Sequence, residues 1–530
     1  MDCETNIDSI RALEEQIREH ERAIVQLKRT RNSLLNVSKL PPEVLGDIFH
    51  RNVTLKGDFD GLDDRSHNFL LVCHHWFEVA LQTPEIWSFW GNTPKDWARL
   101  CRRSGTTPLD LVLKHAGGRH FDTTMRNILQ DRATRDTIRR IHLTTKDSEL
   151  LSSMITSLTS DSEELRSNSI ESFILWNYGD IPVDVSGFFA HHHFPKLRRL
   201  ELFTCTIPLL LWDRLSSRTP VLTTLVLHSL SPSSIPTTSQ LLLILASNPA
   251  LQKITFIGSV VPDDDGSRPS FRVQLRHLKE LRLQGHLRYV IRLLHQLDYP
   301  RNIDELHLTP CGCDVVDISR TIGPYLQDHL QRHNRPRNGL SLFVTRGSNV
   351  DDMWEITLYV GDARGINFSA PEWTNTFVTI TVVLNGALGV DVVGRATLDL
   401  ITHVPREEVV YFQTYDNPIA MEDTYTQFPN VRALSLGTIP LSKAFPKSTM
   451  VGDGRIFPSL EHVLLKNTFA SEGDWSPLMT FLARRVSSGN RLDTLTITNS
   501  SVCPEVMEGI RGMVRELKRK GLITCPFYRF

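Results

Sequence analysis

Residues 197–202 read Leu197-Arg198-Arg199-Leu200-Glu201-Leu202, and this spacing of three apolar residues recurs along the chain. Internal repetition of this kind takes precedence over other signals in a long sequence. The first seven copies begin 25 to 32 residues apart, which leaves room for a strand and a helix in each period. The other nine copies are Ile138-Ile141-Leu143, Ile170-Phe173-Leu175, Leu222-Leu225-Leu227, Leu251-Ile254-Phe256, Leu278-Leu281-Leu283, Ile303-Leu306-Leu308, Val431-Leu434-Leu436, Leu460-Val463-Leu465 and Leu492-Leu495-Ile497.

Segments between the copies carry apolar residues at helical spacing. They are residues 208–218, 237–247, 287–297, 477–486 and 504–520. This alternation resembles leucine-rich repeats, which implies an α/β fold: a curved solenoid of parallel strands with flanking helices. We expect it to occupy residues 93–530. The last segment is expected to be one helix, with Val506, Ile510, Val514 and Leu517 covering the final core face.

The template breaks down between residues 309 and 427. Segments rich in Val, Ile, Thr and Phe remain at 340–344, 355–360, 377–384 and 409–414, and their composition is typical of strands. We expect degenerate repeats that continue the sheet, with an independent inserted domain as the alternative. Loops such as 361–375 are candidates for shaping a binding site.

Residues between the template leucines point away from the core, because side chains alternate along a strand. They are the candidates for contacting a target protein, although many such positions are simply solvated. The charged candidates are Arg199, Glu201, Glu280, Arg282, Glu305 and His307.

Composition narrows the class of protein. The 530 residues suggest two or more folding units, and 40% hydrophobic and 22% charged residues are typical of a globular chain. The formal charge of −1 offers no global field for nucleic acid or an anionic membrane. No apolar run approaches membrane-spanning length, and the 8 cysteines are scattered. We therefore expect protein partners and a cytoplasmic or nuclear protein with reduced thiols.

Residues 1–36 predict a helix with a narrow apolar stripe. The stripe comprises Ile10, Leu13, Ile17, Ile24, Leu27 and Leu34, interrupted at His20 and Arg31. Two interpretations stay open: the helix packs on its own chain, or it forms a homodimer as a short coiled coil.

A second pattern lies in residues 37–92. Leu40-Pro41-Pro42-Glu43 precedes Ile48-Phe49, and Val72-Cys73-His74-His75-Trp76 precedes Pro84-Glu85-Ile86-Trp87. The prolines can open a helix. The order of these elements resembles the F-box, a small helical module. The polar stretch 56–67 is longer than in compact F-boxes and is expected to be a solvated loop.

The F-box resemblance implies docking on the Skp adaptor of a cullin-based ubiquitin ligase complex. By that resemblance, Leu40, Pro41, Pro42, Ile48 and Phe49 lie at or near the adaptor contact. Val72, Cys73 and Trp76 would lie nearby or support it, and Trp87 is expected in the core. The expected function is a substrate-recognition subunit that holds a protein target. The alternative is a leucine-rich scaffold without ubiquitination.

Signatures of catalysis and cofactor binding are missing from the sequence. The adjacent residues His191, His192 and His193 cannot easily converge on one ion. We therefore expect no catalytic residue, metal or cofactor. An enzyme site assembled from distant residues within 309–427 is the remaining alternative.

Overall fold

The computed structural model divides the chain into two compact units, Met1–Arg214 with Leu230–Ser234, and Leu215–Ser229 with Ile235–Phe530. Each unit is described by itself. The described residues are 2–59, 64–90, 102–114, 136–159, 169–191, 194–217, 222–258, 272–300, 303–311, 315–332, 340–348, 354–362, 376–384, 390–415, 427–445, 457–467, 475–500 and 502–520.

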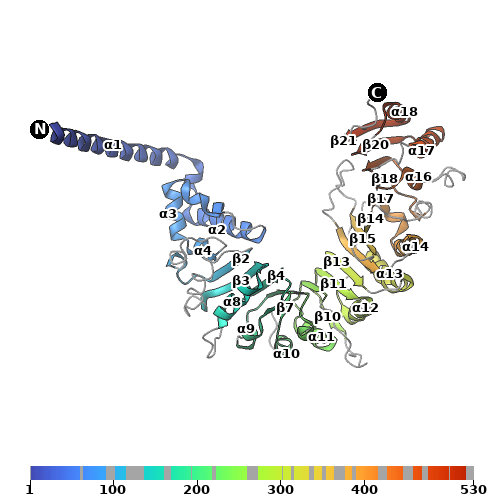
Figure 1. Cartoon of the computed structure of the whole chain (residues 1–530), viewed down its shortest axis with the longest axis horizontal. Helices are drawn as coiled ribbons and strands as arrows, with labels where there is room; N and C mark the ends of the chain where they lie inside the picture. The colour runs from blue at the N-terminus through green and yellow to red at the C-terminus, as the bar shows by residue number, and fades with distance from the viewer. Residues whose placement is uncertain are drawn as a thin grey trace. The chain divides into compact units, whose positions relative to one another are not determined.

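The first unit begins with helices (Figure 1). They are α1 (Asp2–Ser33), the 3-10 turn η1 (Asn36–Lys39), α2 (Pro42–Phe59), η2 (Asp64–Leu71), α3 (His74–Gln82) and α4 (Pro84–Trp87). Proline is well suited to the first turn of a helix, and both α2 and α4 begin with one. The loop predicted at 56–67 is shorter than expected, because α2 extends to Phe59 and η2 begins at Asp64.

Parallel strands follow in the first unit. They are β1 (Phe89–Trp90), β2 (Leu109–Lys114), β3 (Ile138–Thr145), β4 (Ser172–Asn177) and β6 (Arg199–Phe203), paired in that order. The helices α8 (Ser148–Thr159) and α9 (Ser186–His191) lie between them in the chain, and α10 (Leu210–Ser217) follows β6. Short strands β5 (Val183–Asp184) and β7 (Cys205–Thr206) form a separate parallel pair.

The second unit is also built on parallel strands. These are β8 (Thr224–His228), β9 (Lys253–Ile257), β11 (Glu280–His286), β13 (Glu305–Cys311), β17 (Val409–Tyr415), β18 (Ala433–Gly437), β19 (His462–Lys466), β20 (Leu492–Thr498) and β21 (Val514–Lys520). Its helices are α11 (Thr238–Ser247), α12 (Leu287–Gln296), α13 (Val315–Arg332), α14 (Val390–Ile401), α16 (Leu441–Ala444), α17 (Ser476–Ser487) and α18 (Pro504–Met513). From α12 to α18 they lie along one side of the strands (Figure 1). The protein is thus a mixed α/β chain with a large, mostly parallel sheet, and a strand lies at each of the ten template copies.

Within 309–427 the sheet continues, but not as one parallel strand per period. Strands β14 (Leu340–Ser348), β15 (Trp354–Asp362) and β16 (Thr376–Leu384) form an antiparallel meander. β16 pairs with β13, and β14 pairs with β17, both in parallel. The connection 349–353 is too short for a parallel crossover, which needs about a dozen residues. Because its strands join the sheet on both sides, this region is not a separate sheet.

The predicted C-terminal helix was wrong in its second half. α18 ends at Met513, and Val514–Lys520 forms β21 beside β20. Leu517 lies in register with Leu495. The unpaired edge of β20 offers backbone hydrogen bonds to this segment, and that pairing overrides the helical spacing of its apolar residues.

A left-handed residue follows many of the parallel strands at the same offset, two positions after the last template residue. Such residues are Thr204, Ser229, Gly258, Thr438, Asn467 and Asn499, with φ between 47° and 62°. In this conformation the N–H of Ser229 donates to the carbonyl of Ile257 (2.8 Å), and that of Asn467 donates to Thr498 (3.0 Å). The turn therefore adds one backbone hydrogen bond between neighbouring strands. Non-glycine residues rarely adopt this left-handed conformation.

Candidate functional site

The helices α2, η2, α3 and α4 enclose a small core. Leu45, Phe49, Val53 and Phe69 are buried within it, and Phe49 stacks on Phe69 with ring centroids 4.5 Å apart. The indole N–H of Trp87 donates to the carbonyl of Ala80 at 2.7 Å, and Trp87 is buried as expected. Phe49 therefore stabilises the module from within and does not itself lie on the surface.

The other residues expected at the adaptor contact are placed differently. Pro41 and Pro42 are exposed, Ile48 is 47% exposed and Val72 is 54% exposed. Leu40, Cys73 and Trp76 are partly buried, and Leu40 and Trp76 pack against the core.

Further exposed apolar residues, which sequence reasoning missed, accompany them. Val44 (45% exposed) lies four residues before Ile48, so both occupy one face of α2. We call Val44 and Ile48 the α2 ridge. Leu71 (84% exposed) precedes Val72 at the end of η2. Helical spacing alone could have identified Val44, since Leu45, Phe49 and Val53 define the opposite, buried face.

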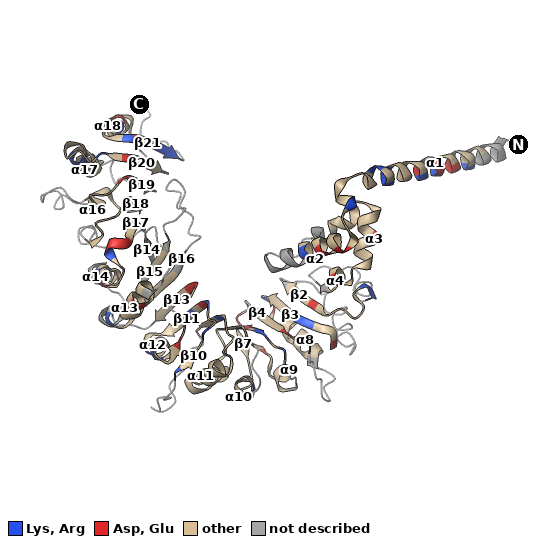
Figure 2. Ribbon diagram, turned by 180° about the vertical axis from the view of Figure 1, so that it is seen from behind, with Lys and Arg blue, Asp and Glu red and all other residues tan. Residues whose placement is uncertain are grey.

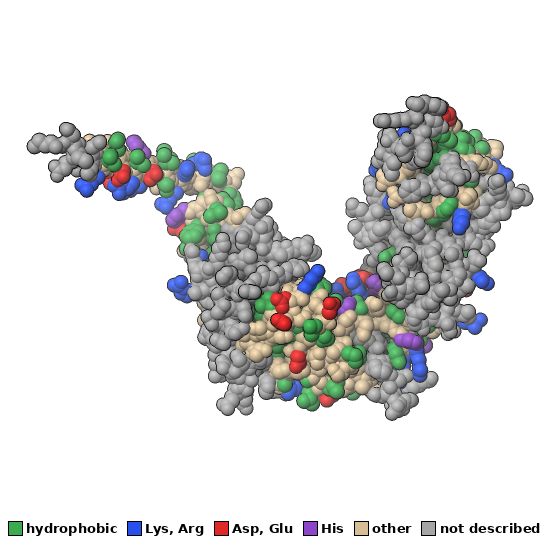
Figure 3. Space-filling model, viewed as in Figure 1, with side chains coloured by type: hydrophobic (Ala, Val, Ile, Leu, Met, Phe, Trp, Pro, Cys, Tyr) green, Lys and Arg blue, Asp and Glu red, His purple; other side chains and the backbone are tan. Residues whose placement is uncertain are grey.

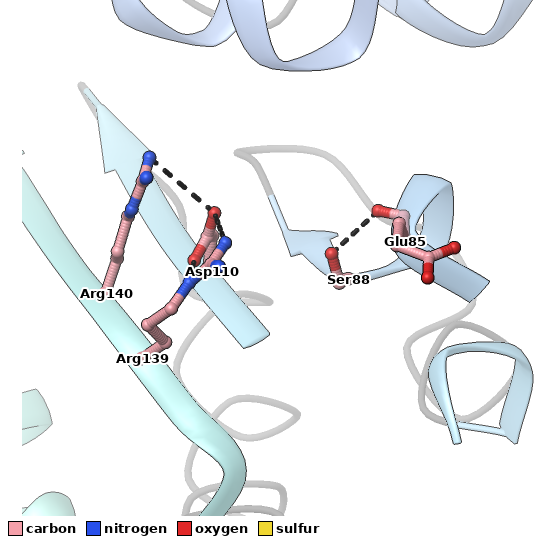
Figure 4. A network of polar contacts seen from close by, with 5 residues as sticks. All are labelled: Glu85, Ser88, Asp110, Arg139 and Arg140. Atoms are coloured by element: carbon pink, nitrogen blue, oxygen red, sulfur yellow. Dashed lines mark hydrogen bonds and ion pairs between the residues drawn. The ribbon is translucent and has the colours of Figure 1, made fainter. Parts of the chain in front are cut away.

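Asp110 in β2 makes two kinds of contact, one through its backbone and one through its buried carboxylate (Figure 4). The backbone N–H of Asp110 in β2 donates to the Ser88 carbonyl at 2.8 Å, directly after α4. The Asp110 side chain, 3% exposed, accepts from Arg139 Nε at 3.1 Å and Nη2 at 3.0 Å. This hydrogen bond raises the pKa of Arg139, and Arg140 lies 3.8 Å from the same carboxylate.

Two predicted target residues form a pair on the first unit. Arg199 donates from Nε to Glu201 Oε1 at 2.6 Å, and Glu201 is almost fully buried. A buried carboxylate requires such a partner. Glu201 therefore holds Arg199 in place and is not itself available on the surface.

The other four predicted target residues lie on β11 and β13 of the second unit, two on each strand; Figure 2 shows where these two strands lie. Glu280 is in register with Glu305, and Arg282 with His307. Arg282 Nη2 lies 2.7 Å from Glu305 Oε1, and Lys253 Nζ of β9 lies 2.6 Å from Glu280 Oε2. These five residues form what we call the charged ladder. Its partly exposed pairs contribute roughly 0–1 kcal/mol each to stability.

His307 is the titratable member of the charged ladder. Burial lowers its pKa, and the Arg282 cation lowers it further, whereas the Glu305 carboxylate opposes the change. His307 is therefore neutral at physiological pH, when it can both donate and accept a hydrogen bond.

Sequence reasoning also missed a cluster of aromatic rings on β3, β4 and β6 and directly after β4. The ring of Trp176 lies 5.6 Å from His142 and 6.3 Å from Tyr178, and Tyr178 lies 5.1 Å from Phe203. Tyr178 is 43% exposed and the other three are partly exposed. Trp176 and Phe203 each follow the last template residue of their strand, which is an outward position because side chains alternate along a strand.

Among the described residues, no group of three His, Cys, Asp or Glu side chains could hold a metal ion. His192, His193 and residues 363–375 of the predicted loop lie outside them. No helix among the described segments has the length and apolar character needed to cross a membrane.

Comparison with known proteins assigns no family to the chain. No protein-family model matches the sequence. No curated protein matches it at a significant level either.

Proposed function

We propose that the protein is the substrate-recognition subunit of a Skp–cullin–F-box ubiquitin ligase. The helical module of residues 37–92 binds the Skp adaptor, and the strand-helix repeats form a leucine-rich solenoid that binds a target protein. The chain catalyses nothing itself. It raises the local concentration of target lysines near the ubiquitin-charged enzyme, in the cytoplasm or nucleus.

The α2 ridge is the observation that carries this proposal. A module of about fifty residues is marginal alone, and exposed apolar residues on it indicate a partner. α2 begins at Pro42 and packs Leu45 and Phe49 inward while Val44 and Ile48 face solvent. This arrangement fits the adaptor contact that the F-box resemblance implies.

The repeats supply the target-binding half of the proposal. The template, a strand at each copy and the left-handed turn at constant offset support a repeated unit. The aromatic cluster adds Trp and Tyr, which are enriched among residues that dominate protein interfaces. The charged ladder adds preformed ion pairs that give specificity more than affinity.

The Asp110 and Arg139 pair supports the same role. A receptor must hold its target at a defined position relative to the ligase, and this pair joins β2 to β3 beside the helical module. Reaction rates between tethered groups depend strongly on such positioning.

Co-purification of the full chain with Skp and cullin from a eukaryotic lysate tests the proposal. We expect wild type to recover both proteins, and Ile48→Asp or the Leu40→Ala/Pro41→Ala double variant to lose both. Leu210→Asp is the matched control, because Leu210 is an exposed apolar residue (62%) on α10.

Recovery of Skp without cullin would favour a receptor that sequesters its target without ubiquitination. If folded wild type recovers neither, the alternative of a leucine-rich binding scaffold replaces the ligase proposal.

A further inference from the structure

Helix α1 exposes a row of large apolar side chains (Figure 3). Its members are Ile10 (52% exposed), Leu13 (59%), Ile17 (56%), Ile24 (50%) and Leu27 (70%), with Leu34 (72%) one residue past the helix end. They recur at alternating spacings of three and four, and His20 and Arg31 occupy the two missing positions. A row with this spacing is typical of the seam along which two helices pack in a coiled coil.

The two polar positions favour one orientation of that second helix. In a parallel pair each position meets itself, so Arg31 would face Arg31 and His20 would face His20. In an antiparallel pair Arg31 faces Leu13 of the other copy, and His20 faces Ile24. The long Arg31 side chain can then lay its methylene groups on the apolar partner while its charged end reaches solvent.

Charge also favours the antiparallel orientation. Between residues 9 and 21 the helix carries Glu14, Glu15, Glu19 and Glu21 against Arg11 and Arg18. Between residues 22 and 33 it carries Arg22, Lys28, Arg29 and Arg31 and no acid. A parallel pair aligns like halves, whereas an antiparallel pair sets each acidic half against a basic one.

Positions beside the seam make this complementarity specific. Glu14 and Lys28 both follow a seam residue by one, at Leu13 and Leu27. In the antiparallel pair Glu14 flanks Lys28 of the other copy, and the contact occurs twice. Glu15 lies away from the seam and pairs within its own helix, 2.9 Å from Arg18. Interaction with the helix dipole would explain acidic residues near the N-terminus of α1 and basic residues near its C-terminus. It would not explain the exposed apolar row.

We propose that α1 binds α1 of a second copy of this chain as an antiparallel two-helix coiled coil. The protein is then a dimer that carries two helical modules and two sets of repeats. The proposal rests on α1 alone and holds whether or not the helical module binds Skp.

Sedimentation velocity of the full chain over a concentration series tests the seam. Ile24→Asp removes a seam residue, whereas Val25→Asp places the same charge on its equally exposed neighbour (47%), which lies off the seam. We expect Ile24→Asp to weaken dimerisation at least about tenfold and Val25→Asp to change it less than about threefold. A monomeric wild type at every concentration, or equal effects of both variants, would overturn the proposal.

Charge exchange tests the orientation. Glu14→Lys and Lys28→Glu should each weaken the dimer, and the double variant should recover wild-type affinity because the pair is restored with reversed signs. Fourteen residues separate the two positions, so they are not neighbours within one helix. If the double variant is as weak as the two effects combined, the helices are not antiparallel.

Discussion

Arg139 of β3 and Asp110 of β2 form a two-point ion pair, in which both carboxylate oxygens accept a hydrogen bond from one guanidinium group, at 3.1 and 3.0 Å. The carboxylate is 3% exposed, whereas Arg139 is 30% exposed. The buried partner therefore depends on the pair more than the arginine does.

Replacing Asp110 with Asn should destabilise the first unit. The substitution removes a charge-assisted pair from a buried site, which costs about 1–3 kcal/mol. We therefore expect the first unit of the Asp110→Asn variant to unfold at a lower urea concentration than that of the wild type. Asp180→Asn, at an exposed carboxylate, is the control and should leave the transition unchanged. Equal transitions in the two variants would contradict a stabilising role for the pair.

Arg485 should be even less tolerant of substitution. Its guanidinium is buried, and burial lowers its pKa. Nη1 donates to the carbonyl of Phe457 at 3.0 Å and Nη2 to that of Leu460 at 2.7 Å. Arg485→Met leaves both carbonyls without these donors and should cost about 2–4 kcal/mol in urea unfolding, whereas Arg484→Ala, at an exposed neighbour, should cost under about 1 kcal/mol. Similar losses in both would argue against the buried bonds.

The low pKa of His307 predicts acid sensitivity of the charged ladder. A histidine whose pKa falls on folding binds a proton more readily when unfolded. Its contribution to stability is complete above the ordinary pKa of 6.5 and is lost as the pH falls below that value. His307→Gln should therefore lose less stability than wild type when the pH is lowered from about 7.5 to about 5. Identical pH profiles would exclude this linkage.

The aromatic cluster predicts where target binding is most easily broken. The Trp176→Ala chain should recover, from a lysate, at least about tenfold less of the proteins that the wild-type chain recovers, whereas its recovery of Skp should be unchanged. Leu210→Ala, at an exposed residue outside the cluster, should change neither. A Trp176→Ala chain that retains both its folding and every captured protein would remove the cluster from the target surface.

The sequence predicted the strands better than it predicted their order. A strand lies at each template copy because the second and third template residues are two positions apart and so occupy one buried face of the strand. The inverted order of β14, β15 and β16 could not be predicted, because segments rich in Val, Thr and Ile form strands that pair in parallel and in antiparallel alike. Likewise, Val514–Lys520 forms β21 because it pairs with the edge strand β20. This pairing depends on the tertiary structure, so the local sequence does not reveal it.

Candidate sites were predicted less completely than strands. Four members of the charged ladder were predicted because they lie between template residues, whereas Lys253 was identified only by its contact with Glu280. Phe49 was placed near the adaptor contact by resemblance, yet it lies in the core, stacked on Phe69, a residue 20 positions away in the chain. The aromatic cluster joins rings from three periods, and only the alignment of β3, β4 and β6 brings them together.

Binding of Skp through the α2 ridge can be measured directly by calorimetric titration of the purified full chain with purified Skp adaptor, comparing wild type with Ile48→Asp and Leu210→Asp. We expect saturable binding by wild type and Leu210→Asp, with affinity at least about tenfold weaker for Ile48→Asp. Equal binding by all three would move the contact away from the α2 ridge. No binding by a folded wild-type chain would contradict the receptor proposal itself.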